Sequence, residues 1–265
     1  MTRSSPPSWL RDRSRNLRKS GQFWLAFFTG WTIACSAMAQ CPEEKRKALQ
    51  MRQRIEQEWP LRPETDEATL YLARLGIRLA TQYGDKGAMV PWHFVLVRNL
   101  APNAFSVGAG NIFITEGAVT FAENEEEMAA IMAHELGHEL AGHFCAVEDT
   151  ADIGGFFDFL MSEHPTPKRR DTVKLGSLQQ SVDVGKEVQA DQIAVSILRA
   201  SGYDPHAMLM VARRLHSDGE GHLFDPRRIQ SLERLLHGVP INGFARDSAR
   251  FQEIRRLVGG WQPGY

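Results

Sequence analysis

The clearest helical pattern in the chain lies between Glu126 and His143. Its apolar face repeats every fourth residue, through Met128, Met132, Leu136 and Leu140. Asn124 precedes this segment as a good N-cap with Glu127 three residues further on, and Glu125 to Glu127 place negative charge where the helix dipole favours it. The pattern predicts a helix whose methionine and leucine stripe packs against a core.

The remaining patterns predict a mostly helical α+β fold with a small β-sheet. Apolar periodicity, with Asp204-Pro205 and Asp225-Pro226 as helix starts, predicts helices over 42–58, 65–83, about 186–198, 206–217, 227–237 and about 246–257. Residues with high β-propensity predict strands over 92–97 and 112–114. In the 65–83 helix the apolar positions include Leu70, Leu72, Leu75, Ile77 and Leu79.

Within the first helix, His134 and His138 are one turn apart, so both imidazoles can reach a single metal ion. Glu135 lies beside them, and H-E-x-x-H spacing is typical of two zinc ligands with a glutamate as general base. The two histidines share a face with Ile131 and Ala141, opposite the methionine and leucine stripe. Both sides of the helix are therefore expected to be covered, which puts the metal inside the fold.

Glu187 and Asp191 are also one helical turn apart, in the segment 186–192. The apolar residues beside them predict a second buried helix face: Ala190, Ile193, Ala194, Ile197 and Leu198. A catalytic zinc site with two histidines needs a third protein ligand and an open position, and we predict Glu187 as that ligand. Asp191 would then accept the free ring N–H of His134 and fix its tautomer.

The two motifs, in this order, resemble the zinc metallopeptidase family of the CAAX prenyl endopeptidase, HtpX and the Oma-type proteases, and most of all its BepA-like periplasmic members without a repeat domain. Asn103-Ala104-Phe105-Ser106, the glycine-led strand 110–117 and Gly202-Tyr203-Asp204-Pro205 agree with the resemblance, which covers roughly 70–235. It implies a gluzincin-type fold with the sheet beside the zinc helix and one Zn2+ per chain. It also implies that Asn103, Ala104 and Phe105 line the substrate groove.

The chain departs from this family after the third-ligand helix, where periplasmic members often carry threonine-histidine-proline followed by arginine-isoleucine. Here the region 222–229 has no histidine directly before its proline, although Arg228-Ile229 matches the end of the pattern. Arg228 and His222 are both candidates for stabilising the oxyanion. The other histidines are not at ligand spacing, and His143 is expected to point to the opposite side of its helix from His134.

The N-terminal segment 1–39 has the pattern of an export signal. Six basic residues face one acid in the first 19 positions, and the next charge-free stretch, 23–39, ends in Ala37-Met38-Ala39. We predict a signal peptide over 1–39 that is cleaved before Gln40, leaving a single metallopeptidase domain over 40–265. An uncleaved anchor facing the periplasm is the alternative, because 17 uncharged residues approach the length that spans a bilayer. A lipoprotein is less favoured, because neither Cys35 nor Cys41 follows a good lipidation box.

Charge and cysteine content narrow the class of protein only slightly. The whole chain has a formal charge of -1 and the leader is strongly basic, so residues 40–265 are acidic, which disfavours a nucleic-acid partner. Cys41 and Cys145 remain after removal of the leader, and either a disulfide or two free thiols fits the sequence.

The motifs and the leader predict an exported zinc endopeptidase with Glu135 as general base. The family resemblance implies that its substrates are misfolded or misassembled cell-envelope proteins. Unfolded protein substrates suit an exposed strand edge, to which an extended peptide can add. A chaperone-like assembly factor with a closed zinc site is the alternative. The apolar segment 156–161, within 148–181, fits a core helix, a mobile lid or a membrane-facing surface, so membrane association also stays open.

Overall fold

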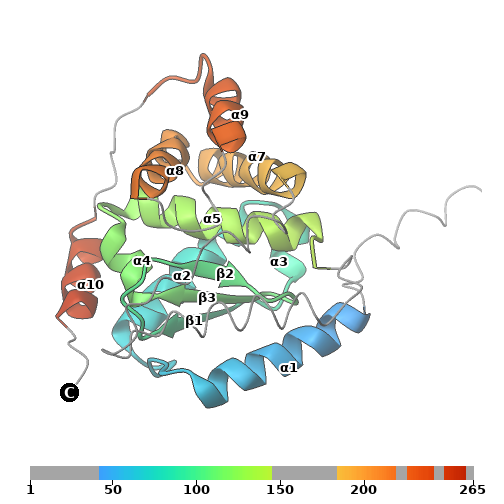
Figure 1. Ribbon diagram of the computed structural model, residues 1–265, viewed down its shortest axis with the longest axis vertical. Helices are drawn as coiled ribbons and strands as arrows, with labels where there is room; N and C mark the ends of the chain where they lie inside the picture. The colour runs from blue at the N-terminus through green and yellow to red at the C-terminus, as the bar shows by residue number, and fades with distance from the viewer. Residues whose placement is uncertain (1–41, 145–183, 219–225, 242–247, 261–265) are drawn as a thin grey trace, which may run out of the picture. The chain divides into compact units, whose positions relative to one another are not determined.

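The computed structural model describes residues 42–144, 184–218, 226–241 and 248–260, which belong to the unit Gln40–Tyr265 (Figure 1). Four subjects of the sequence analysis lie outside the described residues: the leader 1–39, the Cys41 and Cys145 pair, the segment 148–181, and His222. None of the described helices is both long enough and apolar enough to cross a membrane.

The described elements follow in chain order. The first half contains α1 (Pro42–Glu58), α2 (Glu67–Thr81), α3 (Asp85–Met89), β1 (His93–Val97), β2 (Ala104–Ser106), β3 (Asn111–Thr115) and α4 (Glu116–Phe121). The second half contains α5 (Glu125–Ala141), α7 (Val184–Ala200), α8 (His206–Asp218), α9 (Pro226–Leu236) and α10 (Ala249–Gly259). The mostly helical fold with a small sheet is confirmed, and every helix predicted from periodicity is found within a few residues of its expected bounds.

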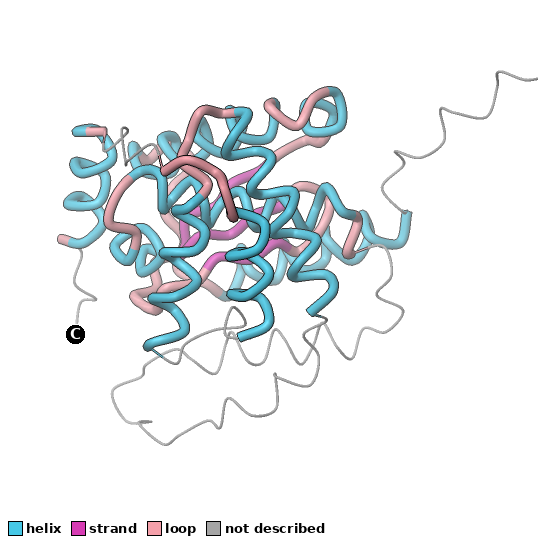
Figure 2. Tube along the Cα trace, turned by 90° about the horizontal axis from the view of Figure 1, so that it is seen from above, coloured by secondary structure: helices cyan, strands magenta, loops and turns pink. Residues whose placement is uncertain are grey.

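The three strands form one sheet in the order β1-β3-β2, with β1 parallel and β2 antiparallel to β3. Side chains alternate between its two faces. Phe94, Leu96, Ala104, Ile112 and Ile114 join the core that includes α2 and α5. Val95, Val97, Phe105 and Phe113 pack instead against Ile55, in α1, and Trp59, directly after it. Figure 2 shows the strands enclosed among helices.

Helix α5 connects the sheet to the later helices, because it contacts β2 on one side and α7 and α8 on others (Figure 1). The predicted stripe of Met128, Met132, Leu136 and Leu140 is buried, with at most 2% of any of these side chains exposed. Asn124 caps the helix by accepting the Glu127 backbone N–H, as predicted. The Glu127 carboxylate accepts the backbone N–H of Glu123 and the Arg214 guanidinium, so it ties α8 to the start of α5.

The structure adds three details to the predicted elements. Leu70 and Ile77 of α2 are 41% and 46% exposed, because the buried face of that helix is formed by Leu72, Leu75 and Leu79. Helices α3 and α4 were not predicted, since one or two turns give too little periodicity to detect. Helix α5 ends at Ala141 rather than at His143, because Gly142 adopts a left-handed conformation with φ of 75°.

Candidate metal centre

Three side chains from two helices converge at one point: His134 and His138 from α5, and Glu187 from α7. The two Nε2 atoms are 3.1 Å apart. Oε2 of Glu187 is 3.3 Å from Nε2 of His134, and Oε1 is 3.4 Å from Nε2 of His138. The predicted ligand residues are therefore brought together, although 49 positions separate His138 from Glu187 in the sequence.

These separations fit a metal ion. Bonds of about 2.0 to 2.1 Å in a tetrahedral site place neighbouring ligand atoms about 3.3 to 3.4 Å apart, close to the spacing found here. The Glu187 side chain is 9% exposed, and its Oε2 has no hydrogen-bond partner among the described residues. A buried carboxylate oxygen without a partner is costly, and a cation between the three side chains would satisfy it. Two imidazoles and one carboxylate are also a ligand set of catalytic zinc sites.

Asp191 of α7 contacts the His134 ring on the nitrogen that faces away from the other ligands. Its Nδ1 lies 3.0 Å from Oδ1 of Asp191, as the spacing of the second motif predicts. Arg228, at the start of α9, donates from Nε and Nη2 to the two oxygens of that carboxylate, each at 2.6 Å. With Nε2 directed to the metal, His134 carries its proton on Nδ1 and donates it to Asp191.

His143 lies next to this centre, which the sequence analysis did not predict. It was expected on the opposite side of the helix, but its Nδ1 lies 3.0 Å from Nδ1 of His138, and its Nε2 lies 3.1 Å from Oε1 of Gln189. The reason is the end of α5 at Gly142, whose left-handed conformation turns the chain back over the last helical turn. The glycine directly before His143 was the available signal.

Glu135 lies next to the three converging atoms and does not contribute to them. Burial is the main reason why its pKa rises to about 7, and the negative charge of Glu187 adds to this effect. Its carboxylate also accepts the backbone N–H of Ser106 in β2, which fixes it against the sheet. A carboxylate with a pKa near neutrality can take a proton and return it within one reaction, as a general base must.

The ligand side chains carry shifted pKa values that reflect their crowding. Burial lowers the pKa of His138 to about 4. Burial and the Arg228 charge oppose protonation of His134, but Asp191 and Glu187 outweigh them and raise its pKa to about 9. Burial alone would raise the pKa of Glu187, yet the two histidines and Arg228 hold it well below its usual range. Without metal, His134 thus carries a second ring proton, on Nε2, in addition to the one on Nδ1, and a metal ion would displace this second proton.

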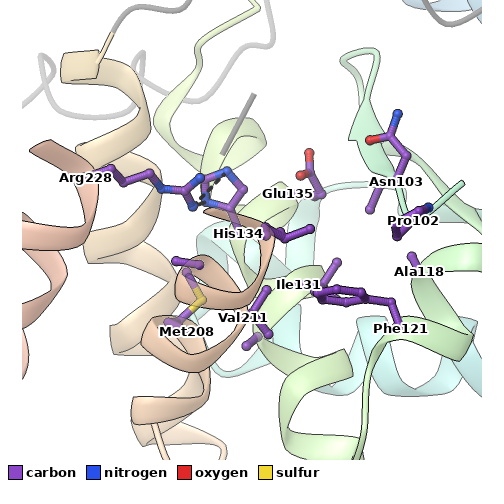
Figure 3. Close-up of a pocket in the computed structure, with 14 residues that line it drawn as sticks. Pro102, Asn103, Ala118, Phe121, Ile131, His134, Glu135, Met208, Val211 and Arg228 are labelled. Atoms are coloured by element: carbon purple, nitrogen blue, oxygen red, sulfur yellow. Dashed lines mark hydrogen bonds between the residues drawn. The ribbon is translucent and has the colours of Figure 1, made fainter. Parts of the chain in front are cut away.

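A pocket opens directly beside this centre, with an empty volume of about 590 Å³ that includes its open mouth. Figure 3 shows Glu135 between His134 and Asn103, with an apolar wall next to them. That wall combines α4, α5 and α8 through Ala118, Phe121, Ala130, Ile131, Met208, Val211, Ala212 and Leu215.

Only two of the three predicted substrate-binding residues line this pocket. Asn103 and Ala104 line it, whereas the Phe105 side chain lies on the other face of the sheet. There it stacks on Phe113 with ring centroids 5.3 Å apart and meets Trp59 edge-on at 5.7 Å. Because side chains alternate along a strand, Ala104 and Phe105 cannot both face the pocket, and Phe105 is a core residue.

Of the two oxyanion candidates, Arg228 lines the pocket and His222 lies outside the described residues. The Arg228 side chain is 2% exposed, and its Nη1 lacks a hydrogen-bond partner among the described residues, although it lies 3.5 Å from Oε2 of Glu187. Asp191 is the main attractive partner of this guanidinium, and holds its pKa above the ordinary value against the effect of burial.

Two histidines one turn apart, a glutamate between them and a carboxylate from a second helix define the class of metallopeptidases with a buried single-metal site. The sequence pattern of peptidase family M48 matches residues 66–236, so the chain belongs to this family. The matched segment contains all three ligand residues. It also contains Glu135, Asp191 and Arg228.

Similar proteins cover two groups of this family. The chain is 27% identical to a beta-barrel assembly-enhancing protease of Escherichia coli (strain K12) over 72% of this chain and 40% of the relative, and 30% identical to one of Yersinia pestis over 53% and 31%. It is 31% identical to the mitochondrial metalloendopeptidase OMA1 of Schizosaccharomyces pombe over 38% of this chain and 30% of the relative. Each alignment therefore covers less than half of the relative's length.

Proposed function

We propose that this protein is a zinc-dependent endopeptidase that cleaves unfolded or misassembled proteins of the cell envelope. The observation that carries the proposal is the position of Glu135. It lies beside three convergent ligand atoms and at the same time on a pocket next to a strand edge. A site that only stored a metal would not need a general base there.

His134, His138 and Glu187 would hold the zinc ion, which supplies a Lewis acid that lowers the pKa of water and polarises the peptide carbonyl. Glu135 takes the proton from the attacking water and then gives it to the nitrogen of the leaving amine. Asp191 keeps His134 in the tautomer that leaves Nε2 free. Arg228 is the candidate cation for the developing oxyanion, because it lines the pocket and its Nη1 has no hydrogen-bond partner among the described residues.

The strand edge and the pocket support this substrate class. Strand β2 is at the edge of the described sheet, and an extended peptide can add to such an edge through backbone hydrogen bonds that ignore sequence. The apolar wall of the pocket, which includes Ile131 and Leu215, would receive an apolar side chain next to the scissile bond. Unfolded proteins offer both an extended backbone and exposed apolar residues.

The cellular location is inferred from the N-terminal sequence and the relatives' names. The basic and then apolar segment 1–39 fits export to the periplasm, with an uncleaved membrane anchor as the alternative. Several similar proteins are named for enhancing β-barrel assembly, which suits quality control in the envelope.

The test is proteolysis of casein by the purified chain, with Glu135→Gln and the exposed Glu253→Gln as matched variants. We expect the wild type and Glu253→Gln to cleave, and Glu135→Gln to lose at least about 100-fold in rate while it keeps its zinc. Mapping of the products should place an apolar residue next to most cleaved bonds. If all three proteins bind zinc and none of them cleaves casein, the proposal of an endopeptidase is wrong and a chaperone-like role is favoured.

A further inference from the structure

The two histidine ligands are supported by different partners, and only one kind of support was expected from the sequence. Asp191 lies directly behind His134, with 2% of its side chain exposed. Behind His138 there is no carboxylate among the described residues. Its Nδ1 instead meets Nδ1 of His143 at 3.0 Å, with the rings edge-on at 5.0 Å between centroids.

The direction of this hydrogen bond follows from which ring nitrogen of His138 faces the metal. His138 offers Nε2 to the site, so its proton is on Nδ1, and the Nδ1 atom of His143 must accept it. His143 then carries its own proton on Nε2, where Oε1 of Gln189 lies 3.1 Å away and can accept it. Each contact thus has one donor and one acceptor, in the order His138, His143, Gln189.

We infer that His143 is a positioning residue for the metal centre, which orients His138 and holds it in its Nδ1–H tautomer, with Gln189 fixing the tautomer of His143. This inference rests on the proposed zinc site. The result is a symmetric arrangement around α7, in which Glu187 binds directly, Asp191 supports His134 and Gln189 supports His138 through His143.

Burial and helix geometry favour this role. His143 is 8% exposed although it lies beyond the end of α5, in a segment where polar side chains are usually solvated. Its backbone N–H donates to the carbonyl of His138, at 3.2 Å, which anchors the imidazole over its partner. A histidine held at both its backbone and its side chain next to a ligand restricts the rotation of that ligand ring.

The experiment measures zinc affinity by competition with a chromophoric chelator, for the full chain and three variants. His143→Leu removes the acceptor at similar size, His143→Asn returns an oxygen where Nδ1 lies, and His237→Leu changes an exposed histidine as a control. We expect His143→Leu to weaken zinc binding by about 10- to 100-fold, with His143→Asn within a few-fold of the wild type and His237→Leu unchanged. The visible spectrum of the cobalt-substituted protein should shift in His143→Leu and return in His143→Asn.

Equal zinc affinity in His143→Leu and the wild type would overturn the inference. Equal loss in His143→Leu and His143→Asn would overturn it too, because it would assign the effect to shape rather than to the acceptor. Thermal unfolding of the metal-free variants separates a general loss of stability from loss of the ligand. If the wild type binds no zinc, the proposed function fails as well, whereas a zinc-binding wild type with an indifferent His143→Leu sinks this inference alone.

Discussion

Glu125 and Glu135 belong to the same helix, yet their pKa values move in opposite directions. Burial dominates at Glu135 and raises its pKa to about 7. Burial also opposes ionisation of Glu125, but hydrogen bonds from the hydroxyls of Ser248, Tyr203 and Tyr71 outweigh it and lower the pKa. One carboxylate is therefore kept ready to exchange a proton, while the other is held charged as a structural anchor.

Glu125→Gln is expected to destabilise the fold at neutral pH and not at low pH. Because the folded-state pKa of Glu125 lies below its ordinary value of 4.5, its stabilisation is full above about pH 4.5 and is lost as the pH falls through the folded value. We expect a loss of about 1 to 3 kcal/mol in the free energy of unfolding at pH 7, from weaker hydrogen bonds to a neutral amide.

Urea unfolding at pH 7 and near pH 3.5 measures this difference, with the exposed Glu253→Gln as the control for removal of one negative charge. A deficit of Glu125→Gln that stays the same at both pH values would contradict the assigned role.

Individual residues of the site differ in how far the sequence could predict them. The ligand residues and Asp191 follow from helical spacing, because a 3.6-residue period fixes which side chains share a face. His143 does not, since its position depends on the left-handed glycine directly before it, Gly142, which ends the helix at Ala141. Phe105 was placed in the groove by resemblance, but strand alternation turns its side chain into the core.

At the scale of elements, the metal centre depends on how closely α5 and α7 approach. Gly137 makes the approach possible, because a Cβ atom built on it would lie 2.5 Å from the carbonyl oxygen of Ala190. Ala190 lies between Glu187 and Asp191 on the same helix. The glycine inside the H-E-x-x-H motif therefore sets the distance at which the third ligand can meet the two histidines.

Gly137→Ala is expected to push α7 away from α5, because the added methyl group meets backbone that cannot rotate aside. We expect a loss of about 1 to 3 kcal/mol in stability despite the better helix propensity of alanine. Zinc affinity should fall at least tenfold, as Glu187 moves from the histidines. Gly259→Ala in α10 is the matched control, because its Cβ would make only an ordinary contact with Thr120 at 3.4 Å.

Thermal unfolding and chelator competition measure both effects. If Gly137→Ala binds zinc as tightly as the wild type, the close approach of α5 and α7 is not what sets the ligand geometry. The sequence predicted that these two helices meet at the metal, because their motifs supply ligands to one site. It did not predict how closely their backbones approach, since an apolar face does not show which surface covers it. Long helices were predicted within a few residues, while α3 and α4 were too short to give a period.

Over the described part of the molecule, the two faces of the sheet differ. One face only packs against the core, and the other lies on the side of the helix that carries metal ligands. Aromatic and β-branched residues on one face pack with Ile55 and Trp59 of the α1 region. The other face shares its core with α5, which carries His134 and His138, and the backbone of Ser106 in β2 contacts Glu135 of the same helix. The edge strand β2, the pocket and the metal centre therefore lie together, as family M48 membership leads one to expect of a peptidase.

The proposed function requires one metal ion held between His134, His138 and Glu187. The most direct test is the zinc content per chain after zinc loading and removal of excess metal, for the wild type, Glu187→Gln, His138→Gln and Glu135→Gln. We expect one zinc per chain in the wild type and in Glu135→Gln, and loss of bound zinc in the two ligand variants. A wild type without zinc, or a Glu187→Gln that retains a full equivalent, would contradict it.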